Sequence, residues 1–493
     1  MMLLSETLAL PVSGGEGTCA GVGSKRPYPL NNPLPSLLLT SLCCANLAFA
    51  SSASAQQVPP VAPASAPALP NPYMLVPKSN GNYLTPLLTL RPLRAAYAAS
   101  PMWGNDYLQT LGTNESFVGN DAEAITDFDA ETLDHAPASK EAIAQDEVLL
   151  KGYTAVDARQ AILAAADHQA IFINEAHHVP MDRAFTLSLL RGLYAKGFRY
   201  FAAETLYKRD ANLQRRGYPV HNTGYYTNEP VFGDLVRTAI KIGYKVVPYE
   251  YEGPRLSDPI ASQNQRERGE AQNLYDRIFK NDPKAKVLVH AGYAHIAKMT
   301  FTMDFTPGAF TSQTASGDAT MMALWFQRIT KIVPFSVDQT NMMEHSVLQY
   351  ESGYYQAAIA DNLLQEVPIV LRNKAGHYFV RPDAPTAYDM IIFNPRVQYE
   401  FGRPTWLNMN GLRQAYALPG DLGVPANTSA LVQAFYENEP AASAIPIDQV
   451  EIKPGLNPLP SLMLPKGRFH LRVVNGAGTV LREWHIDRNG ATP

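Results

Sequence analysis

The sequence predicts an α/β protein built on a mainly parallel sheet flanked by helices, with a β-rich module at its C-terminal end. Three observations predict this class. Helical periodicity alternates with short apolar runs between residues 153 and 340. A helix precedes each run, which implies right-handed crossovers between parallel strands. Beyond residue 343 the runs are separated by Gly, Pro and Asn, as in antiparallel sheets.

Residues 1–55 have the features of a signal peptide region. A basic pair precedes an apolar stretch at 34–50, and small-residue cleavage sites end at Ala50 and Ala55. We expect cleavage before Gln56, with an uncleaved anchor as the alternative. The segment therefore predicts a periplasmic or secreted protein.

Composition narrows the classes of partner. The 493 residues are 46% hydrophobic and 17% charged, with a net charge of −4 and no long basic run, so nucleic acid is excluded as an expected partner. After signal cleavage no segment reaches the ~18 continuous apolar residues of a membrane span. A thiol nucleophile is excluded from the mature chain, because every cysteine precedes residue 50: Cys19, Cys43 and Cys44.

The rest of the chain divides into five expected parts. A Pro- and Ala-rich linker covers 56–72, and an irregular N-terminal wrap with little periodicity covers 73–150. The α/β domain covers 151–342. A β-rich or lid segment follows at 343–444, and a small β-sandwich-like module ends the chain at 445–493.

Within the α/β domain the period of apolar residues predicts each element. Buried strands are expected at 171–174, 199–203, 245–249, 286–290 and 332–337. The helices that precede them are expected at 156–166, 181–196, 231–242, 261–279 and 319–329.

The C-terminal part contains four further expected strands. Residues 367–371 and 390–393 are short apolar runs, and 468–474 alternates polar and apolar side chains. The segment 475–478, Asn-Gly-Ala-Gly, predicts a hairpin turn into a last strand at 480–484.

Carboxylates and imidazoles follow several of the expected strands directly. Glu175, His177 and His178 follow the first strand, Glu204 ends the second, and His295 follows the fourth. The C-terminal ends of parallel strands share one edge of the sheet, where α/β proteins bind ligands. A carboxylate that ends an apolar strand must be paired or solvated there. The sequence therefore predicts a functional site at this edge, although adjacent histidines also cap helices or occupy surface turns.

A charged helix precedes the strand that leads to His295. Arg266, Glu270 and Asn273 share one of its faces, which is ordinarily a solvated surface, but this helix could direct an arginine at the same edge. His290 lies within its strand and is expected to be a hydrogen-bonded core residue. Glu250 and Glu252 are as consistent with solvated loop acids as with site residues.

Four segments together resemble one superfamily, that of erythromycin esterases, ChaN-type haem-binding proteins and Tiki/TraB proteases. They read Asn-Glu-Ala-His-His at 174–178, Ala-Glu at 203–204, Arg-Glu-Arg-Gly-Glu-Ala-Gln-Asn at 266–273 and Gly-Tyr-Ala-His at 292–295. Family members carry Gly-Glu-x-His or Gly-Glu-x-x-His at the first. Asn174 replaces that glycine, and Glu270 stands where relatives often have methionine.

The resemblance covers about residues 153 to 340 and implies a fold and a set of site residues. His177 matches the spacing of the ChaN and Tiki relatives, and His178 that of the esterases. The implied site consists of Glu175, His177 or His178, Glu204, Arg266 and His295.

These groups predict a hydrolase that activates water to cleave an ester or amide in a small molecule or peptide. Serine acyl-enzyme, zincin and phosphate-loop motifs do not occur. Without metal, an imidazole takes the proton while Arg266 or the other histidine stabilises the oxyanion. With metal, His177, Glu204 and His295 would bind a divalent ion. The alternatives are a non-catalytic haem-binding protein with axial histidines and a structural envelope protein.

Overall fold

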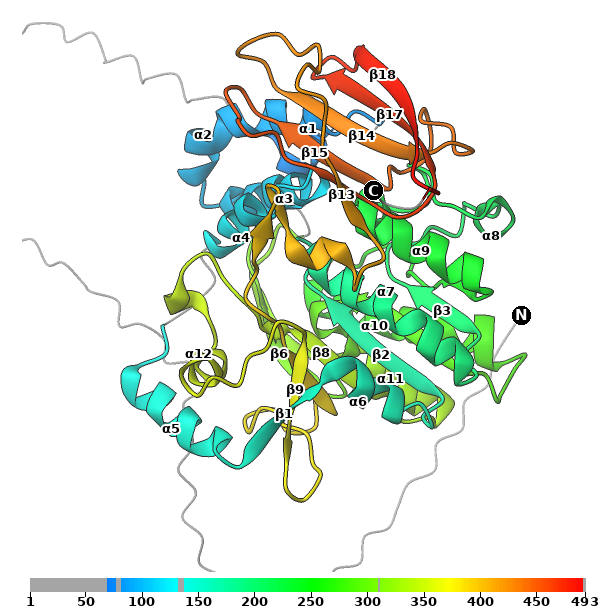
Figure 1. The fold of residues 1–493 in the computed structure, drawn as a ribbon. Helices are drawn as coiled ribbons and strands as arrows, with labels where there is room; N and C mark the ends of the chain where they lie inside the picture. Colours follow the sequence, from blue (N-terminus) through cyan, green and yellow to red (C-terminus); the bar gives the residue numbers. More distant parts are fainter. Residues whose placement is uncertain (1–68, 77–80, 132–136, 309–310, 491–493) are drawn as a thin grey trace, which may run out of the picture. The chain divides into compact units, whose positions relative to one another are not determined.

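An eight-stranded sheet carries the main core, with strand order β1-β9-β10-β8-β2-β5-β3-β4. The structure is a computed structural model that describes residues 69–76, 81–131, 137–308 and 311–490, so the expected signal region and most of the linker lie outside it. The strands, shown in Figure 1, are β1 (Tyr153–Asp157), β2 (Ala170–Glu175), β3 (Tyr200–Ala203), β4 (Lys245–Pro248), β5 (Val287–Gly292), β8 (Phe335–Met342), β9 (Ile369–Asn373) and β10 (Met390–Phe393).

The expected helix–strand alternation is confirmed. Caps explain why α9 starts and stops where it does: Glu229 accepts hydrogen bonds from two N–H groups of the first turn, Pro230 follows it, and Gly243 ends the helix in the left-handed conformation. The helices are α6 (Ala158–Ala164), α7 (Pro180–Ala195), α9 (Pro230–Ile242), α10 (Pro259–Leu274), which continues as a π-helical turn over Tyr275–Phe279, and α11 (Met322–Thr330).

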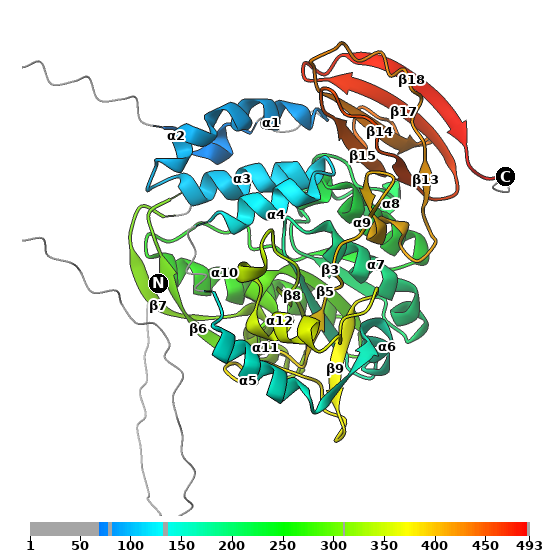
Figure 2. The same ribbon diagram turned by 60° about the vertical axis from the view of Figure 1, so that its left-hand side comes forward.

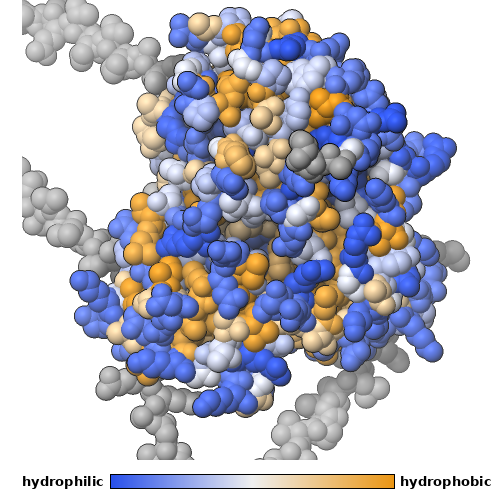
Figure 3. Space-filling view, in the orientation of Figure 1, coloured by the Kyte–Doolittle hydropathy of each residue, from blue (hydrophilic) through white to orange (hydrophobic). Residues whose placement is uncertain are grey.

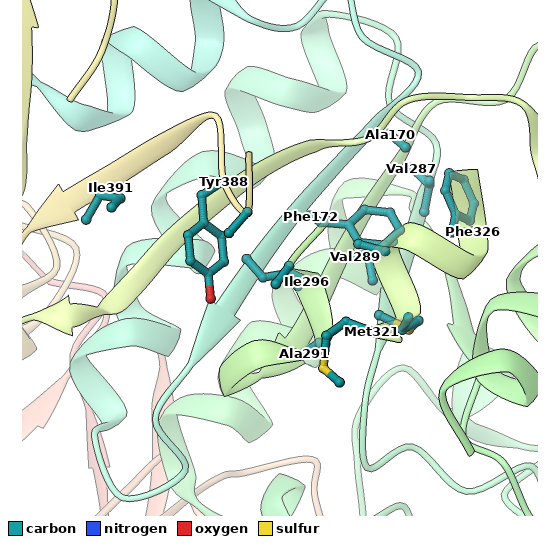
Figure 4. Packing of buried hydrophobic residues seen from close by; sticks show 14 of the residues in the cluster. Ala170, Phe172, Val287, Val289, Ala291, Ile296, Met321, Phe326, Tyr388 and Ile391 are labelled. Carbon is teal, nitrogen blue, oxygen red and sulfur yellow. The ribbon is translucent and has the colours of Figure 1, made fainter. Parts of the chain in front are cut away.

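The two faces of the sheet bury separate apolar cores. Ile171 and Ile173 of β2 face α6, α7 and α9, whereas Phe172 faces α10 and α11, because successive side chains of a strand point to opposite faces. Figure 4 shows Phe172 and Phe326 in the second core. Side chains on both faces make these strands continuously apolar, as is typical of parallel sheets.

Parallel pairing brings three strand ends to one edge. β2 pairs in parallel with β5 and β8, and β5 pairs in parallel with β3. In this register Glu175 lies opposite Gly292, and Ala203 lies opposite His290. The residues that follow β2, β3 and β5 are therefore neighbours.

The prediction of an irregular segment over 73–150 is wrong. This segment forms the helices α1 (Leu84–Leu90), α2 (Arg94–Ala98), α3 (Gly104–Phe117), α4 (Asp121–Asp129) and α5 (Lys140–Leu150), of which α1 to α4 form the layer seen in Figure 2. The second half of α3 is buried on all sides, including its polar Thr113, Asn114 and Glu115. A helix buried all round has no apolar stripe, so its periodicity is weak.

The expected boundary at residue 342 is also wrong, because the main sheet continues past it. β9 and β10 join this sheet, and α12 (Gly353–Ala360) packs on its core. The strand expected at 332–337 begins at Phe335 and extends to Met342. A hairpin of β6 (Thr300–Phe305) and β7 (Ala315–Thr320) precedes α11, where a helix was expected from residue 319.

The β-rich C-terminal end is confirmed. β14 (Ala430–Tyr436), β15 (Asp448–Ile452), β17 (Arg468–Asn475) and β18 (Val480–Asp487) form an antiparallel sheet, and β17 and β18 make the expected hairpin. A second sheet of β13 (Gln414–Tyr416) and β16 (Leu462–Leu464) shares the same core, so the module starts well before residue 445.

The surface in the orientation of Figure 1 mixes hydrophilic and hydrophobic residues (Figure 3). Within the described ranges, no helix has the length and apolar character that crossing a bilayer requires.

Candidate active site

A cleft of about 1560 Å³ opens at the edge where β2, β3 and β5 end. Its floor carries residues that follow these strands and residues of α10. Its other walls come from α3, from the segment around Pro101 and from the hairpin of β6 and β7. Polar residues of the floor are His177, Glu204, Tyr226, Glu250, Arg266 and His295.

One half of the floor is built around Glu175, the last residue of β2. Its buried carboxylate accepts hydrogen bonds from Arg183 Nε (2.5 Å) and Nη2 (3.0 Å). The imidazoles of His177, through Nδ1, and His290, through Nε2, each lie 2.9 Å from it. Burial opposes ionisation, but Arg183 and the two imidazoles hold the pKa of Glu175 well below its usual range.

His177 is the histidine that faces the cleft. Because ionised Glu175 can only accept, Nδ1 carries the proton in the neutral form of His177, and Nε2 is then the acceptor. The ring stacks on Tyr226 at a centroid distance of 3.8 Å. A Cβ on Gly292 would lie only 2.6 Å from this Nε2 and 3.1 Å from Glu204 Oε2, so the absence of a side chain there leaves room for both groups.

His178 points away from the cleft. It is buried, stacks on Phe128 at 3.7 Å, and lines a small separate pocket with Met181 and Trp406. Burial lowers its pKa to about 3. Of the two spacings that the sequence left open, the structure therefore brings His177 to the predicted edge. The turn after β2 directs the ring of His178 into the interior, so His178 does not line this cleft.

The other half of the floor is a cluster around Arg266 of α10. Arg266 donates from Nη2 to Glu204 Oε1 (2.7 Å) and from Nη1 to His295 Nε2 (2.8 Å). Its Nε lies 2.9 Å from Glu270 Oε1. Glu204 also accepts a hydrogen bond from the backbone N–H of Gly292. The structure thus brings together Glu204, Arg266 and His295, residues separated by up to 91 positions in the sequence.

His295 is held from both ring nitrogens. Nδ1 lies 2.7 Å from Glu267 Oε1, and Nε2 accepts from Arg266, which cannot itself accept a hydrogen bond. Glu267 and Glu204 raise the pKa of His295 to about 9, against the effect of burial and of Arg266. Nε2 also lies 3.7 Å from Glu204 Oε1.

Carboxylates outnumber cations in this second half. Glu267 and Glu270 are fully buried, and Glu250 Oε2 lies 3.7 Å from Arg266. Glu270 Oε2 has no hydrogen-bond donor in the described part of the chain. Burial raises the pKa of Glu270 well above its usual range, and Glu250 and Glu267 add to the shift. Arg266 and His295 lower the pKa of Glu204 to about 2 despite its burial.

The predicted metal trio is not the one that the structure gathers. Arg266 bridges Glu204 and His295, so a cation already stands where an ion would bind them, and His177 is held by Glu175 on the other side of Gly292. Instead Glu267, Glu270 and His295 each offer a ligand atom within 4.8 Å of the others. The unpartnered Glu270 oxygen fits a divalent ion, which would supply a water of lowered pKa.

Two residues at the strand ends have unusual backbone conformations. Thr205, after Glu204, has a φ of 75°, and Tyr293, after Gly292, has a φ of 43°. A β-branched residue rarely adopts positive φ, and such strain clusters at functional sites. Thr205 donates its N–H to Glu250 (2.8 Å), and its hydroxyl accepts from the N–H of Tyr226 (2.9 Å), the residue stacked on His177. Thr205 therefore connects the two halves of the floor.

The other polar residues named from the sequence have simple roles. Asn174 points into the sheet, donating to Asp338 (2.6 Å) and to the carbonyl of Tyr293 (2.8 Å). His290 is buried and hydrogen-bonded, as expected. Glu252 accepts from the backbone of Lys208 at 3.3 Å.

Sequence reasoning did not single out the residues that support this floor. Arg183 is fully buried and also contacts Glu229 at 3.2 Å. Arg183 could have been recognised in the sequence as a charged residue on an otherwise apolar helix face. Tyr226 lies in a segment without regular pattern and gave no such signal. Glu267 was read only as part of a charged run.

Comparisons with known proteins identify no family for this chain. No family model and no curated protein match it. A solved structure described as bacterial protein toxins is similar at 12% identity and TM-score 0.26, covering 53% of this chain and 57% of that one. RRSP, a MARTX toxin effector domain from Vibrio vulnificus, is similar at 15% identity and TM-score 0.27, covering 54% and 55%.

The C-terminal region of Pasteurella multocida toxin, described as having a thiol-protease-like catalytic triad, is similar at 8% identity and TM-score 0.27, covering 76% of this chain and 51% of that one. The chain thus spans little more than half the length of these structures. Similarities this weak indicate no function.

Proposed function

We propose that this chain is a hydrolase that cleaves an ester or amide with a water molecule activated at the floor of the cleft. One observation carries the proposal: His177 presents its Nε2 to the cleft while Glu175 holds its Nδ1 from behind, beside the Glu204–Arg266–His295 cluster. An imidazole oriented by a carboxylate is the arrangement that general-base catalysis requires.

The reaction follows from the hydrogen bonds. His177 Nε2 takes a proton from water, whose oxygen forms a bond to the substrate's carbonyl carbon. The negative charge that develops on the carbonyl oxygen is stabilised by Arg266, which is one-third exposed to the cleft. His177 then returns the proton to the leaving alcohol or amine as its bond to carbon breaks. Such base assistance contributes ~10²–10⁴ in rate.

A divalent metal is compatible with this proposal but is not part of the steps above. Glu267, Glu270 and His295 would hold it, next to Arg266. The resemblance to the erythromycin esterase, ChaN and Tiki superfamily remains a prediction. It is supported by the meeting of Glu175, His177, Glu204, Arg266 and His295 on one cleft floor. Export to the periplasm or medium is proposed from the N-terminal sequence alone.

Matched histidine variants test the proposal. The mature chain from Gln56 is assayed on panels of nitrophenyl esters and fluorogenic peptides, with chelator and with added Zn²⁺ or Mn²⁺. We expect His177→Gln to lower kcat/KM by ~10²–10⁴ with an unchanged melting temperature. His178→Gln, one position away but outside the cleft, should retain activity. Activity that survives in His177→Gln contradicts the proposal.

Haem binding is the alternative outcome of the same preparation. Both ring nitrogens of His295 are already engaged, by Glu267 and Arg266, which disfavours it as an axial ligand. A Soret band that forms on haem addition and disappears in His177→Gln, in a protein without hydrolytic activity, would replace the hydrolase by a haem-binding protein.

A further inference from the structure

Across the cleft from this floor lies a buried carboxylate that has no ion-pair partner in the described part of the chain. Glu131 is only 6% exposed, and it lines the cleft. Its Oε2 accepts one hydrogen bond, from Gln109 Nε2 of α3 at 3.2 Å. Its Oε1 is buried and has no hydrogen-bond partner among the described residues. An ionised oxygen left in this way costs far more free energy than one paired with a donor.

The surroundings of Glu131 are negative as well. The residue follows the C-terminal end of α4, and its N–H bonds to the carbonyl of Phe128, so the negative end of the helix dipole points toward it. Asp106 lies close enough to raise the pKa of Glu131, which burial and this neighbour bring to about 7. Arg94, which also lines the cleft, is paired with Asp127 at 2.5 Å.

Glu131 is also close to the proposed chemistry. Its charge acts on Tyr293, whose pKa burial and Glu131 both raise. The ring of Tyr293 lies edge-on to His177 at 5.1 Å. Glu131 and His177, the imidazole proposed to face the substrate, thus line the same cleft.

We propose that Glu131 forms a subsite for a positively charged group of the substrate, an ammonium or guanidinium such as a lysine or arginine side chain. The inference rests on the proposed function, since it names the kind of substrate that the His177 site would cleave. The ammonium would donate to the vacant Oε1, and such a charge-assisted hydrogen bond favours an organic cation. The cleft is larger than a typical small-molecule pocket, so a peptide segment would fit it.

Binding of two matched peptides tests this subsite. In the full mature chain carrying His177→Gln, which removes turnover, we titrate an acetylated pentapeptide amide with a central lysine among alanines. The control peptide replaces lysine by norleucine, which keeps the alkyl stem but removes the charge. We expect the lysine peptide to bind about tenfold more tightly, as one charge-assisted hydrogen bond in a buried site provides.

A second variant assigns that preference to Glu131. Glu131→Gln should abolish it, whereas Glu366→Gln, at an exposed carboxylate outside the cleft, should retain it. Equal binding of the two peptides overturns the subsite even if Glu131→Gln does not fold, since that comparison needs no variant at this position. If the lysine peptide binds more tightly but the wild type hydrolyses no substrate, the subsite is supported and the proposed hydrolase is contradicted. If the wild type hydrolyses substrates but binds both peptides equally, the hydrolase is supported and the subsite is contradicted.

Discussion

The two halves of the cleft floor differ in how completely their charges are paired. Around Glu175, both carboxylate oxygens are engaged by Arg183 and by two imidazoles. Around Arg266, the carboxylates Glu204, Glu250, Glu267 and Glu270 compete for one guanidinium and one imidazole. Neither Glu270 oxygen has a hydrogen-bond donor in the described part of the chain, although Oε1 lies 2.9 Å from Arg266 Nε.

This difference indicates different tasks for the two halves. A fully paired carboxylate holds one imidazole in one tautomer, and it contributes to stability as well as to orientation. A cluster with surplus carboxylate is costly in the free protein, and such strained charge is typical of sites that bind or transfer protons. The same substitution should therefore have opposite effects on stability in the two halves.

The largest expected effect is that of Glu175→Gln. Glutamine offers one acceptor oxygen where the carboxylate accepts from Arg183, His177 and His290, and its amide N–H groups face those donors. Leaving Arg183 buried without an anionic partner on this side should lower the free energy of unfolding by about 3–5 kcal/mol, measured by urea denaturation at pH 7.

Acid should reduce this effect. The pKa of Glu175 is held below its usual range, so its contribution is present at neutral pH and disappears as pH falls through the lowered value. A loss in Glu175→Gln of less than about 1 kcal/mol would contradict the idea that this half is held by its ion pairs.

The next effect concerns His295 at alkaline pH. Its pKa is raised from 6.5 to about 9, so the charged form stabilises the folded protein fully below pH 6.5 and progressively less as pH rises to about 9. The wild type should lose about 1–3 kcal/mol of unfolding free energy across this window. His295→Gln should remove this slope, which thermal unfolding from pH 6 to 9.5 measures, with His178→Gln as the buried-histidine control. An unchanged slope would mean that His295 is neutral throughout.

The residues at this edge of the sheet could be predicted from the sequence, because short-range patterns along the chain mark where each strand ends. An apolar run that ends at Glu175 or at Glu204 marks both the strand and the point where it meets solvent, and parallel pairing follows from the helices between the runs. The helix face of Arg266, Glu270 and Asn273 was equally readable, since i, i+4 and i+7 share a face. The structure confirms the mainly parallel sheet flanked by helices, and it places Arg266 against both Glu204 and His295.

The remaining features depend on contacts between distant segments. Tyr226 stacks on the ring of His177, and Phe128 stacks on the ring of His178. These contacts decide which histidine faces the cleft, and both aromatic residues come from segments without a recognisable apolar periodicity. The predicted set of metal ligands differs from the set that the structure gathers because Arg266 contacts both Glu204 and His295. Sequence spacing does not reveal these two contacts. The N-terminal helices were missed because α3 is buried on all sides, which removes the periodicity that marks a surface helix.

The smallest expected effect is a gain of stability in Glu270→Gln, and it has the opposite sign to that of Glu175→Gln. The glutamine would keep a polar group next to Arg266, whose Nε lies 2.9 Å from Glu270 Oε1, while the surplus buried charge disappears. Because the pKa of Glu270 is raised above 4.5, its ionisation destabilises the folded protein above pH 4.5, increasingly as pH rises. The variant should therefore gain about 1 kcal/mol of unfolding free energy at pH 7 and nothing at pH 4.

Glu267→Gln is the matched control on the same helix. Glu267 is fully engaged, by Met322 N (2.6 Å), Gln263 (2.5 Å) and His295, so this variant should lose stability. If both variants lose stability equally at pH 7, the carboxylates around Arg266 are not in surplus, and the two halves of the floor are paired alike.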